Sequence, residues 1–251
     1  LTAGEANVFS GTVPDTYIPM ASGGADILRG FVPAYVEGLN QIMGVVPGSI
    51  TTDADENTAY GYNAGAGLTD GDRNVFIGRD AGSAITTGIS NIAIGRYALQ
   101  NATTDGYQIG IGSQAGGSAT DGSVSIGHMA GNAAGTKKVA IGYQSLLYPS
   151  GTSNTAVGYH AMKGPAAGTI SAYSSVAVGK EALVSVTTGH SNIAIGLGAG
   201  YNITTAKETV IIGKDAGKGV VGGEAGVYIG YNAGGSTMTG IRNTVVGSSA
   251  G

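Results

Sequence analysis

The chain contains no cysteine and no tryptophan, and only 6 of its 251 residues are proline. Without cysteine there is no disulfide and no thiolate metal site, so the fold must hold without covalent cross-links. The few prolines, and glycines without a strict period of three, exclude a collagen triple helix. No run of 18 apolar residues occurs, so the sequence predicts no membrane-spanning helix.

Charge is scarce as well. Charged residues make up 11% of the chain and hydrophobic residues 42%, which is the reverse of the composition of disordered proteins. The net charge of −4 gives no general attraction to nucleic acid or to anionic membranes, so neither is expected as a partner.

Glycine is in excess, with 47 residues. Glycines preceded by an aliphatic or aromatic residue recur in steps of 17, except for steps of 15, 15, 16 and 21 between Gly112 and Gly179. These anchor glycines are Gly61, Gly78, Gly95, Gly112, Gly127, Gly142, Gly158, Gly179, Gly196, Gly213, Gly230 and Gly247.

Other positions repeat with the anchors. The third residue before each anchor is β-branched, and the residue directly before it is Ile or Val except at Tyr60. These two positions share one face of a short strand, and the position between them, mostly small, points the other way. Since both faces lack charge, we expect one to line the coil and the other to meet a neighbouring chain. Small residues such as Ala140, Ala156 and Ala177 are expected at that contact between chains.

Asparagine recurs four residues before the anchors, where stacked side chains about 4.8 Å apart can hydrogen-bond in a column. Pairs of threonine beside Gly or Asp, such as Thr86-Thr87 and Thr187-Thr188, suggest a second short strand in each coil. The asparagine column consists of Asn57, Asn74, Asn91, Asn154, Asn192 and Asn243.

The sequence therefore predicts an all-β fold, a parallel β-solenoid or β-roll of about twelve coils of ~17 residues, over residues 57–251. Residues 1–56 lack the repeat and are expected to cap the first coil or to attach the chain to another virion or filament subunit. Within them, residues 25–43 have apolar residues near helical spacing, weakened by Gly30, Pro33 and Gly38. Because one thin roll can bury only one strand face, a homotrimer about the long axis is expected.

Two repeat families are similar to this chain. Asn-Ile-Ala-Ile-Gly at 91–95 and 192–196, Asn-Thr-Ala-Val-Gly at 154–158 and the alanine three residues later resemble the β-roll head of trimeric autotransporter adhesins. They also resemble the repetitive shaft of phage tail fibres, which the longer coil and the Gly-Tyr pairs, as at Gly61-Tyr62, favour. The resemblance covers residues 57–251 and implies a parallel trimeric fibre outside the cell or on a virion.

No pattern indicates catalysis. His128, His160 and His190 occupy different repeat positions, so they need not converge on a metal. The acidic groups Asp70 with Asp72, and Asp53 with Asp55 and Glu56, lie in turn-rich segments where Asp caps backbone amides. We therefore expect no enzyme, no catalytic residue, no cofactor and no metal site. Tyr62, Tyr143, Tyr159 and Tyr231 share one position and form a candidate strip for stacking on a surface glycan.

The expected function is that of a structural fibre or appendage of a phage virion, located on the virion or at a cell surface. A bacterial surface adhesin or filament subunit is the main alternative. Less favoured are a polysaccharide-degrading tailspike, which needs an acidic cleft, and an ice-binding solenoid, which needs the threonine pairs in register on one exposed face.

Overall fold

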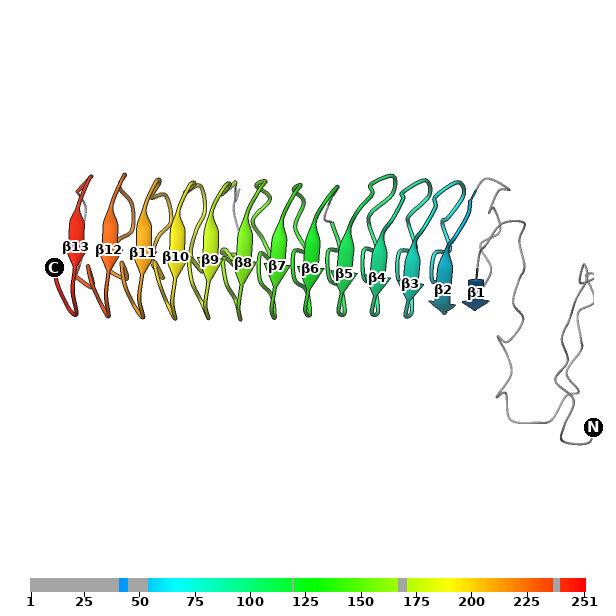
Figure 1. The fold of residues 1–251 in the computed structure, drawn as a ribbon, viewed down its shortest axis with the longest axis horizontal. Coiled ribbons are helices and arrows are strands. Elements are labelled where there is room, and N and C mark those ends of the chain that lie inside the picture. Colours follow the sequence, from blue (N-terminus) through cyan, green and yellow to red (C-terminus); the bar gives the residue numbers. More distant parts are fainter. Residues whose placement is uncertain (1–40, 45–53, 119, 167–170, 237–239) are drawn as a thin grey trace, which may run out of the picture.

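The computed structural model describes residues 41–44, 54–118, 120–166, 171–236 and 240–251. Its secondary structure is a single sheet of parallel strands that follow one another in chain order along a straight rod (Figure 1). The all-β, parallel β-solenoid predicted from the repeat is confirmed. The strands are β1 (Gln41–Gly44), β2 (Thr58–Gly61), β3 (Val75–Ile77), β4 (Ile92–Ile94), β5 (Ile109–Ile111), β6 (Val124–Ile126), β7 (Val139–Ile141), β8 (Thr155–Val157), β9 (Val176–Val178), β10 (Ile193–Ile195), β11 (Val210–Ile212), β12 (Val227–Ile229) and β13 (Thr244–Val246).

Within the described residues, the ladder begins one coil before the repeat recognised in the sequence. β1 pairs in parallel with β2, and Gly44 lies opposite Gly61, again 17 residues away. This coil was missed because Gln41 is not β-branched and Pro47 stands where alanine recurs. Of the residues with helical spacing, 25–40 lie outside the described residues, and 41–43 belong to β1.

Each strand stops at its anchor glycine because the backbone turns there. The anchors have φ between 123° and 137°, a conformation that L residues rarely adopt. They also stack on one another along the rod. A Cβ added to Gly179 would lie 2.5 Å from the carbonyl oxygen of Gly196, so each coil can rest on the next only if this position has no side chain.

The two strand faces are oriented opposite to the expectation. The small residue in the middle of each strand points into its own coil, where Ala140, Ala156 and Ala177 are fully buried. The β-branched residues on either side face outward, and Ile193 and Ile195 are each 40% exposed. The coil is too thin to enclose two bulky side chains from one strand, so the smaller column lies inside. Glutamate at Ala140, Ala156 or Ala177 would therefore disrupt the coil itself, not a contact between chains.

The sizes of the interior side chains at two positions of each coil depend on one another: where one residue is large, the other is small. One is the middle of the strand, and the other is the fourth residue after the anchor, which lies in the left-handed region with φ from 47° to 85°. Where the strand carries Ala177, that residue is Leu183; where it carries Phe76, that residue is Gly82. A Cβ on Gly82 would lie 2.4 Å from the Phe76 ring. No described coil carries a large side chain at both of these positions.

The second strand expected at the threonine pairs is absent from the described residues. Thr86-Thr87 and Thr204-Thr205 form bends. They still link coils, because the Thr86 amide donates to the Thr103 carbonyl at 2.8 Å and the Thr204 amide to the Val221 carbonyl at 2.9 Å. Each coil therefore has one regular strand and an opposite side held by isolated coil-to-coil hydrogen bonds.

The irregular steps leave the ladder in register. Strands β5 to β9 pair residue for residue although their anchors are 15, 15, 16 and 21 residues apart. In the longest coil, Pro165 and Ala166 are exposed, and the Gly164 and Ser171 amides both donate to carbonyls of the next coil, at 3.0 and 2.9 Å. The coil therefore keeps its hydrogen bonds to the next coil up to Gly164 and again from Ser171. The four extra residues of this coil and its Pro165 favour a loop that bulges outward, but residues 167–170 lie outside the described residues.

Candidate functional surfaces

The asparagine column lies inside the rod and joins the coils. Asn57, Asn74, Asn91, Asn154 and Asn192 are at most 1% exposed. The Asn74 Oδ1 atom accepts the amide of Asn91 at 2.9 Å, and its Nδ2 atom donates to the Gly88 carbonyl at 2.8 Å. The column therefore ties each strand to the next coil and to the turn that leads into it.

Asn243, in the last coil, is partly buried. Its Nδ2 atom donates to the Gly240 carbonyl at 2.9 Å and to the Tyr228 hydroxyl at 3.4 Å. Asparagine is replaced at other coils of the same column, among them Gln108, Ser123 and Lys138.

Lys138 is the unusual member of this column, because it places an amine inside the rod. Its Nζ atom donates to the carbonyls of Gly131 and Ala133. Burial lowers the pKa of Lys138 from 10.5 to about 8. No carboxylate is among the causes of this shift, so the amine is stabilised chiefly by backbone carbonyls.

In the middle of the tyrosine column, neighbouring side chains cover the ring faces. The rings of Tyr143 and Tyr159 stack with centroids 5.4 Å apart and an angle of 9° between their planes. His128 lies against the Tyr143 ring at 5.3 Å, and the Lys180 ammonium lies 5.7 Å from the Tyr159 ring. Stacking on a sugar needs a free ring face, and these neighbours along the rod cover the faces. At Tyr143 and Tyr159 the ring faces are therefore closed to a sugar, whereas their edges and hydroxyl groups remain accessible.

The tyrosines at the two ends of this column are also paired with cations. The Arg79 guanidinium lies 5.8 Å from the ring of Tyr62, and the Lys214 ammonium lies 5.7 Å from that of Tyr231. Each cation is held over the ring of the neighbouring coil.

The histidines form two separate groups. His160 lies beside Tyr159 with ring centroids 3.9 Å apart, and His190 stacks on Tyr173 at 4.5 Å, at the opposite turn. Burial lowers the pKa of His160, and the charge of Lys163 lowers it further. Among the described residues, no three His, Cys, Asp or Glu side chains gather in a way that could hold a metal ion.

Two carboxylates accept backbone amides in turns. Asp72 accepts the amide of Asp55 at 2.9 Å, and Asp121 accepts the amide of Gly106 at 2.6 Å. Burial and the charge of Asp121 raise the pKa of Asp105. Asp53 lies outside the described residues. The contacts of Asp72 and Asp121 match the capping role expected for Asp in such turns.

The outer strand face is an aliphatic strip, interrupted only by Thr58, Tyr60, Thr155 and Thr244. It consists of the residues three before and one before each anchor, all β-branched except Tyr60. Ile77, Ile141, Ile212 and Ile229 are between 36% and 38% exposed, and Val246 is 64% exposed. Twelve strands about 4.8 Å apart and two side chains wide give a strip on the order of 500 Å², at the upper end of the apolar patches that monomers expose.

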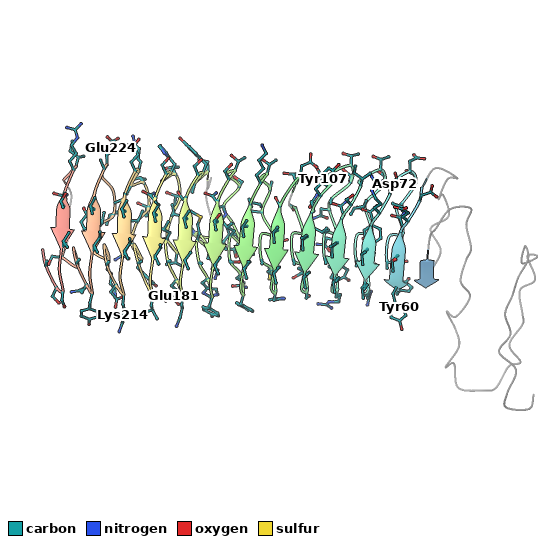
Figure 2. The ribbon with its side chains drawn as sticks, in the orientation of Figure 1. Tyr60, Asp72, Tyr107, Glu181, Lys214 and Glu224 are labelled. Atoms are coloured by element: carbon teal, nitrogen blue, oxygen red, sulfur yellow. The ribbon has the colours of Figure 1, made fainter. Side chains whose placement is uncertain are left out.

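The two long edges of the rod carry different side chains. One edge is formed by the turns that follow the anchors, and Glu181 and Lys214 lie on it (Figure 2). The opposite edge is formed by the turns that precede the strands, and Asp72 and Glu224 lie there. The described residues include no helix that could span a membrane. Neither a family model, nor a curated protein, nor a solved structure matches this chain.

Proposed function

We propose that the chain is the shaft of a homotrimeric structural fibre, an appendage of a phage virion that reaches toward a host or capsid surface. The observation that carries this proposal is the aliphatic strip along the outer strand face. An apolar surface of this length and regularity is typical of an interface. Three chains around a common axis would each cover the strip of a neighbour and leave none exposed.

The construction of the coil supports a mechanical role. Anchor glycines stack in contact along the rod, and the buried asparagines hydrogen-bond from coil to coil. A solenoid of this kind transmits load along its axis through contacts between neighbouring coils alone. The trimeric arrangement and the place on a virion or cell surface come from the resemblance of the repeat to fibre shafts and adhesin heads. A bacterial adhesin or filament subunit would use the same strip in the same way.

Two other functions lack support in the described residues. The Thr86 and Thr204 hydroxyls donate to carbonyls of the next coil at 3.2 Å, so they do not form the free array that ice binding needs. A tailspike needs paired carboxylates in a cleft. Asp72 and Asp121 instead accept backbone amides in turns.

The oligomeric state of the purified chain tests the proposal. Wild-type protein should have three times the chain mass of 24.6 kDa by mass photometry or sedimentation. The triple variant Ile141→Lys, Ile195→Lys, Ile212→Lys places charges on the strip and should be monomeric with an unchanged β-sheet circular dichroism spectrum.

The matched control changes exposed aliphatic residues away from the strip. Leu197, Val221 and Ile241 are 45%, 50% and 57% exposed and lie outside the strands. Lysine at these three positions should leave the trimer intact. A wild-type monomer at micromolar concentration would refute the proposal, and a mass of two chains would refute the trimer.

A further inference from the structure

Charge is distributed unequally between the two long edges of the rod. The edge formed by the turns after the anchors is termed the basic edge, and the opposite edge the acidic edge. The basic edge carries six cations, Arg79, Arg96, Lys163, Lys180, Lys214 and Lys218, and three carboxylates, Asp80, Glu181 and Asp215. The acidic edge carries eight carboxylates, Asp55, Glu56, Asp70, Asp72, Asp105, Asp121, Glu208 and Glu224, and four cations, Arg73, Lys137, Lys207 and Arg242.

The carboxylates of the basic edge lie beneath its cations. In the pair of Arg79 with Asp80, the side chains are 60% and 15% exposed, and in that of Lys218 with Asp215, 49% and 22%. The Lys180 side chain is 54% exposed and that of Glu181 31%. The outermost groups of this edge are therefore positive, although the chain as a whole carries a net charge of −4.

Tyrosine rings hold in place the cations that directly follow the anchors. Arg79, Arg96, Lys180 and Lys214 each lie over a tyrosine ring, at 5.1 to 5.8 Å from its centroid. The position directly after the anchor contains no carboxylate in the described coils. Coils stack about 4.8 Å apart, so this position forms a straight row. It contains four cations and four tyrosines, interspersed with Ser113, His128, Leu197 and Ser248.

We propose that the basic edge binds an extended polysaccharide that carries carboxylate groups. The row of cations supplies charge complementarity, and the tyrosine hydroxyls can hydrogen-bond to the many hydroxyls of a sugar chain. This inference builds on the proposed role as an attachment fibre and names the class of partner. It concerns the turns, whereas the proposed trimer contact concerns the outer strand face.

Nucleic acid fits this edge less well than a polysaccharide. Six cations between the coils of Arg79 and Lys218 are spaced by about 8 Å on average, whereas phosphates follow every 3.4 Å along a strand. Single-stranded nucleic acid also binds by stacking bases on free aromatic faces. The stacked faces of Tyr143 and Tyr159 are closed to such contacts.

The test compares two quadruple variants that lose the same charges from opposite edges. The basic-edge variant is Arg79→Gln, Arg96→Gln, Lys180→Gln, Lys214→Gln. The control is Arg73→Gln, Lys137→Gln, Lys207→Gln, Arg242→Gln, with two arginines and two lysines removed from the acidic edge. Binding of the full chain to immobilised polygalacturonate is measured at low and at physiological salt, with neutral dextran and duplex DNA as further probes.

Wild type should bind polygalacturonate, and more tightly at low salt than at physiological salt. It should not bind dextran at either salt concentration, and it should not bind DNA at physiological salt. The basic-edge variant should lose affinity by at least about tenfold, and the control should stay within about twofold of wild type. Equal losses in both variants, no binding by wild type, or DNA binding as tight as polygalacturonate would each overturn the proposal. Mass photometry on the same samples reports the oligomeric state, so failure of the glycan site and failure of the proposed trimer are read separately.

Discussion

At the scale of the residue, backbone conformation explains most of the repeat. The fourth residue after each anchor has a left-handed conformation, which costs a non-glycine residue on the order of 1 kcal/mol. Leu99, Leu146, Met162 and Leu183 accept this cost because each is fully buried, which contributes roughly 2 kcal/mol. This explains the mixture of Gly, Leu and Met at this position. Glycine adopts the left-handed conformation without a steric cost, whereas Leu and Met offset that cost by filling the interior.

The stacked anchors predict that the same substitution has different effects in the middle and at the end of the ladder. Gly179→Ala and Gly247→Ala both introduce a side chain at a φ near 130°. Only at Gly179 would the new Cβ meet a carbonyl oxygen of the next coil, at 2.5 Å; at Gly247 the nearest atom is the Ala250 Cβ at 3.8 Å. Gly179→Ala should therefore lower the free energy of unfolding by about 2 kcal/mol more than Gly247→Ala, measured by urea denaturation. Equal losses would mean that stacking of the anchors contributes little.

Lys138 predicts a pH dependence of stability. Its pKa is about 8 in the folded chain and 10.5 in the unfolded chain, so the unfolded state binds more protons between these values. Wild type should therefore gain stability as the pH rises from 8 to 10.5, by up to about 3 kcal/mol, whereas below pH 8 the full cost of burying the charge is present. Lys138→Asn, which returns the residue common at this position, should remove that gain.

The measurement is the difference in unfolding free energy between wild type and Lys138→Asn at pH 7 and at pH 10.5. Taking the difference cancels the titration of the tyrosines that both proteins share. The variant should be the more stable at pH 7, and the difference should shrink at pH 10.5. A difference that does not change with pH would show that the amine is solvated in the folded state.

At the scale of the element, the sequence predicted the strands and their register but not which face lies inside. β-branched residues two apart identified a strand before Gly142 or Gly196, and the parallel ladder followed from the repeat. The alternation could not assign the faces, because alanine and isoleucine are both apolar. Which face lies inside depends on the thickness of the coil, and that thickness is set by all residues of the coil together.

The threonine pairs and the basic edge are two further features that the sequence analysis did not predict correctly. Thr86-Thr87 has good strand propensity, yet a left-handed residue at Ser90 follows closely and the backbone bends. The basic edge could have been found in the sequence, because Arg79, Arg96 and Lys180 all follow an anchor directly. The signal is weak because the same position also carries tyrosine, serine, histidine and leucine, so no single residue type marks this edge.

The long coil between Gly158 and Gly179 gives a prediction about insertions. Deleting Pro165 to Gly168 would shorten it from 21 to 17 residues, the usual length, and the flanking amides of Gly164 and Ser171 already bond to the next coil. The deletion should leave the circular dichroism spectrum and the oligomeric state unchanged and the unfolding free energy within about 1 kcal/mol, since surface loops tolerate changes of length. Loss of the oligomer would show that the segment belongs to an interface.

At the scale of the whole molecule, the rod contains a weak segment. The buried apolar residues form two clusters, one ending at Ala102 and the other beginning at Ala130. Between them the strand interiors carry only Gly110 and Ser125, and the coils are short. Gln108 Nε2 and Oε1, Thr120 Oγ1 and Ser125 Oγ are buried without a partner, which is unfavourable for each group.

A solenoid is stabilised coil by coil, so a local loss of packing lowers local stability. We expect the amides of β5 and β6 to exchange with solvent at least about tenfold faster than those of β4 and β10, measured by native-state hydrogen exchange. Ser125→Ala removes an unsatisfied hydroxyl and restores the alanine found at Ala140, so it should slow exchange in β5 and β6. Ser113→Ala, in a turn of the same region, serves as the control and should change nothing. Uniform protection along the rod would mean that the small residues pack as well as the leucines and that the two apolar clusters unfold as one unit.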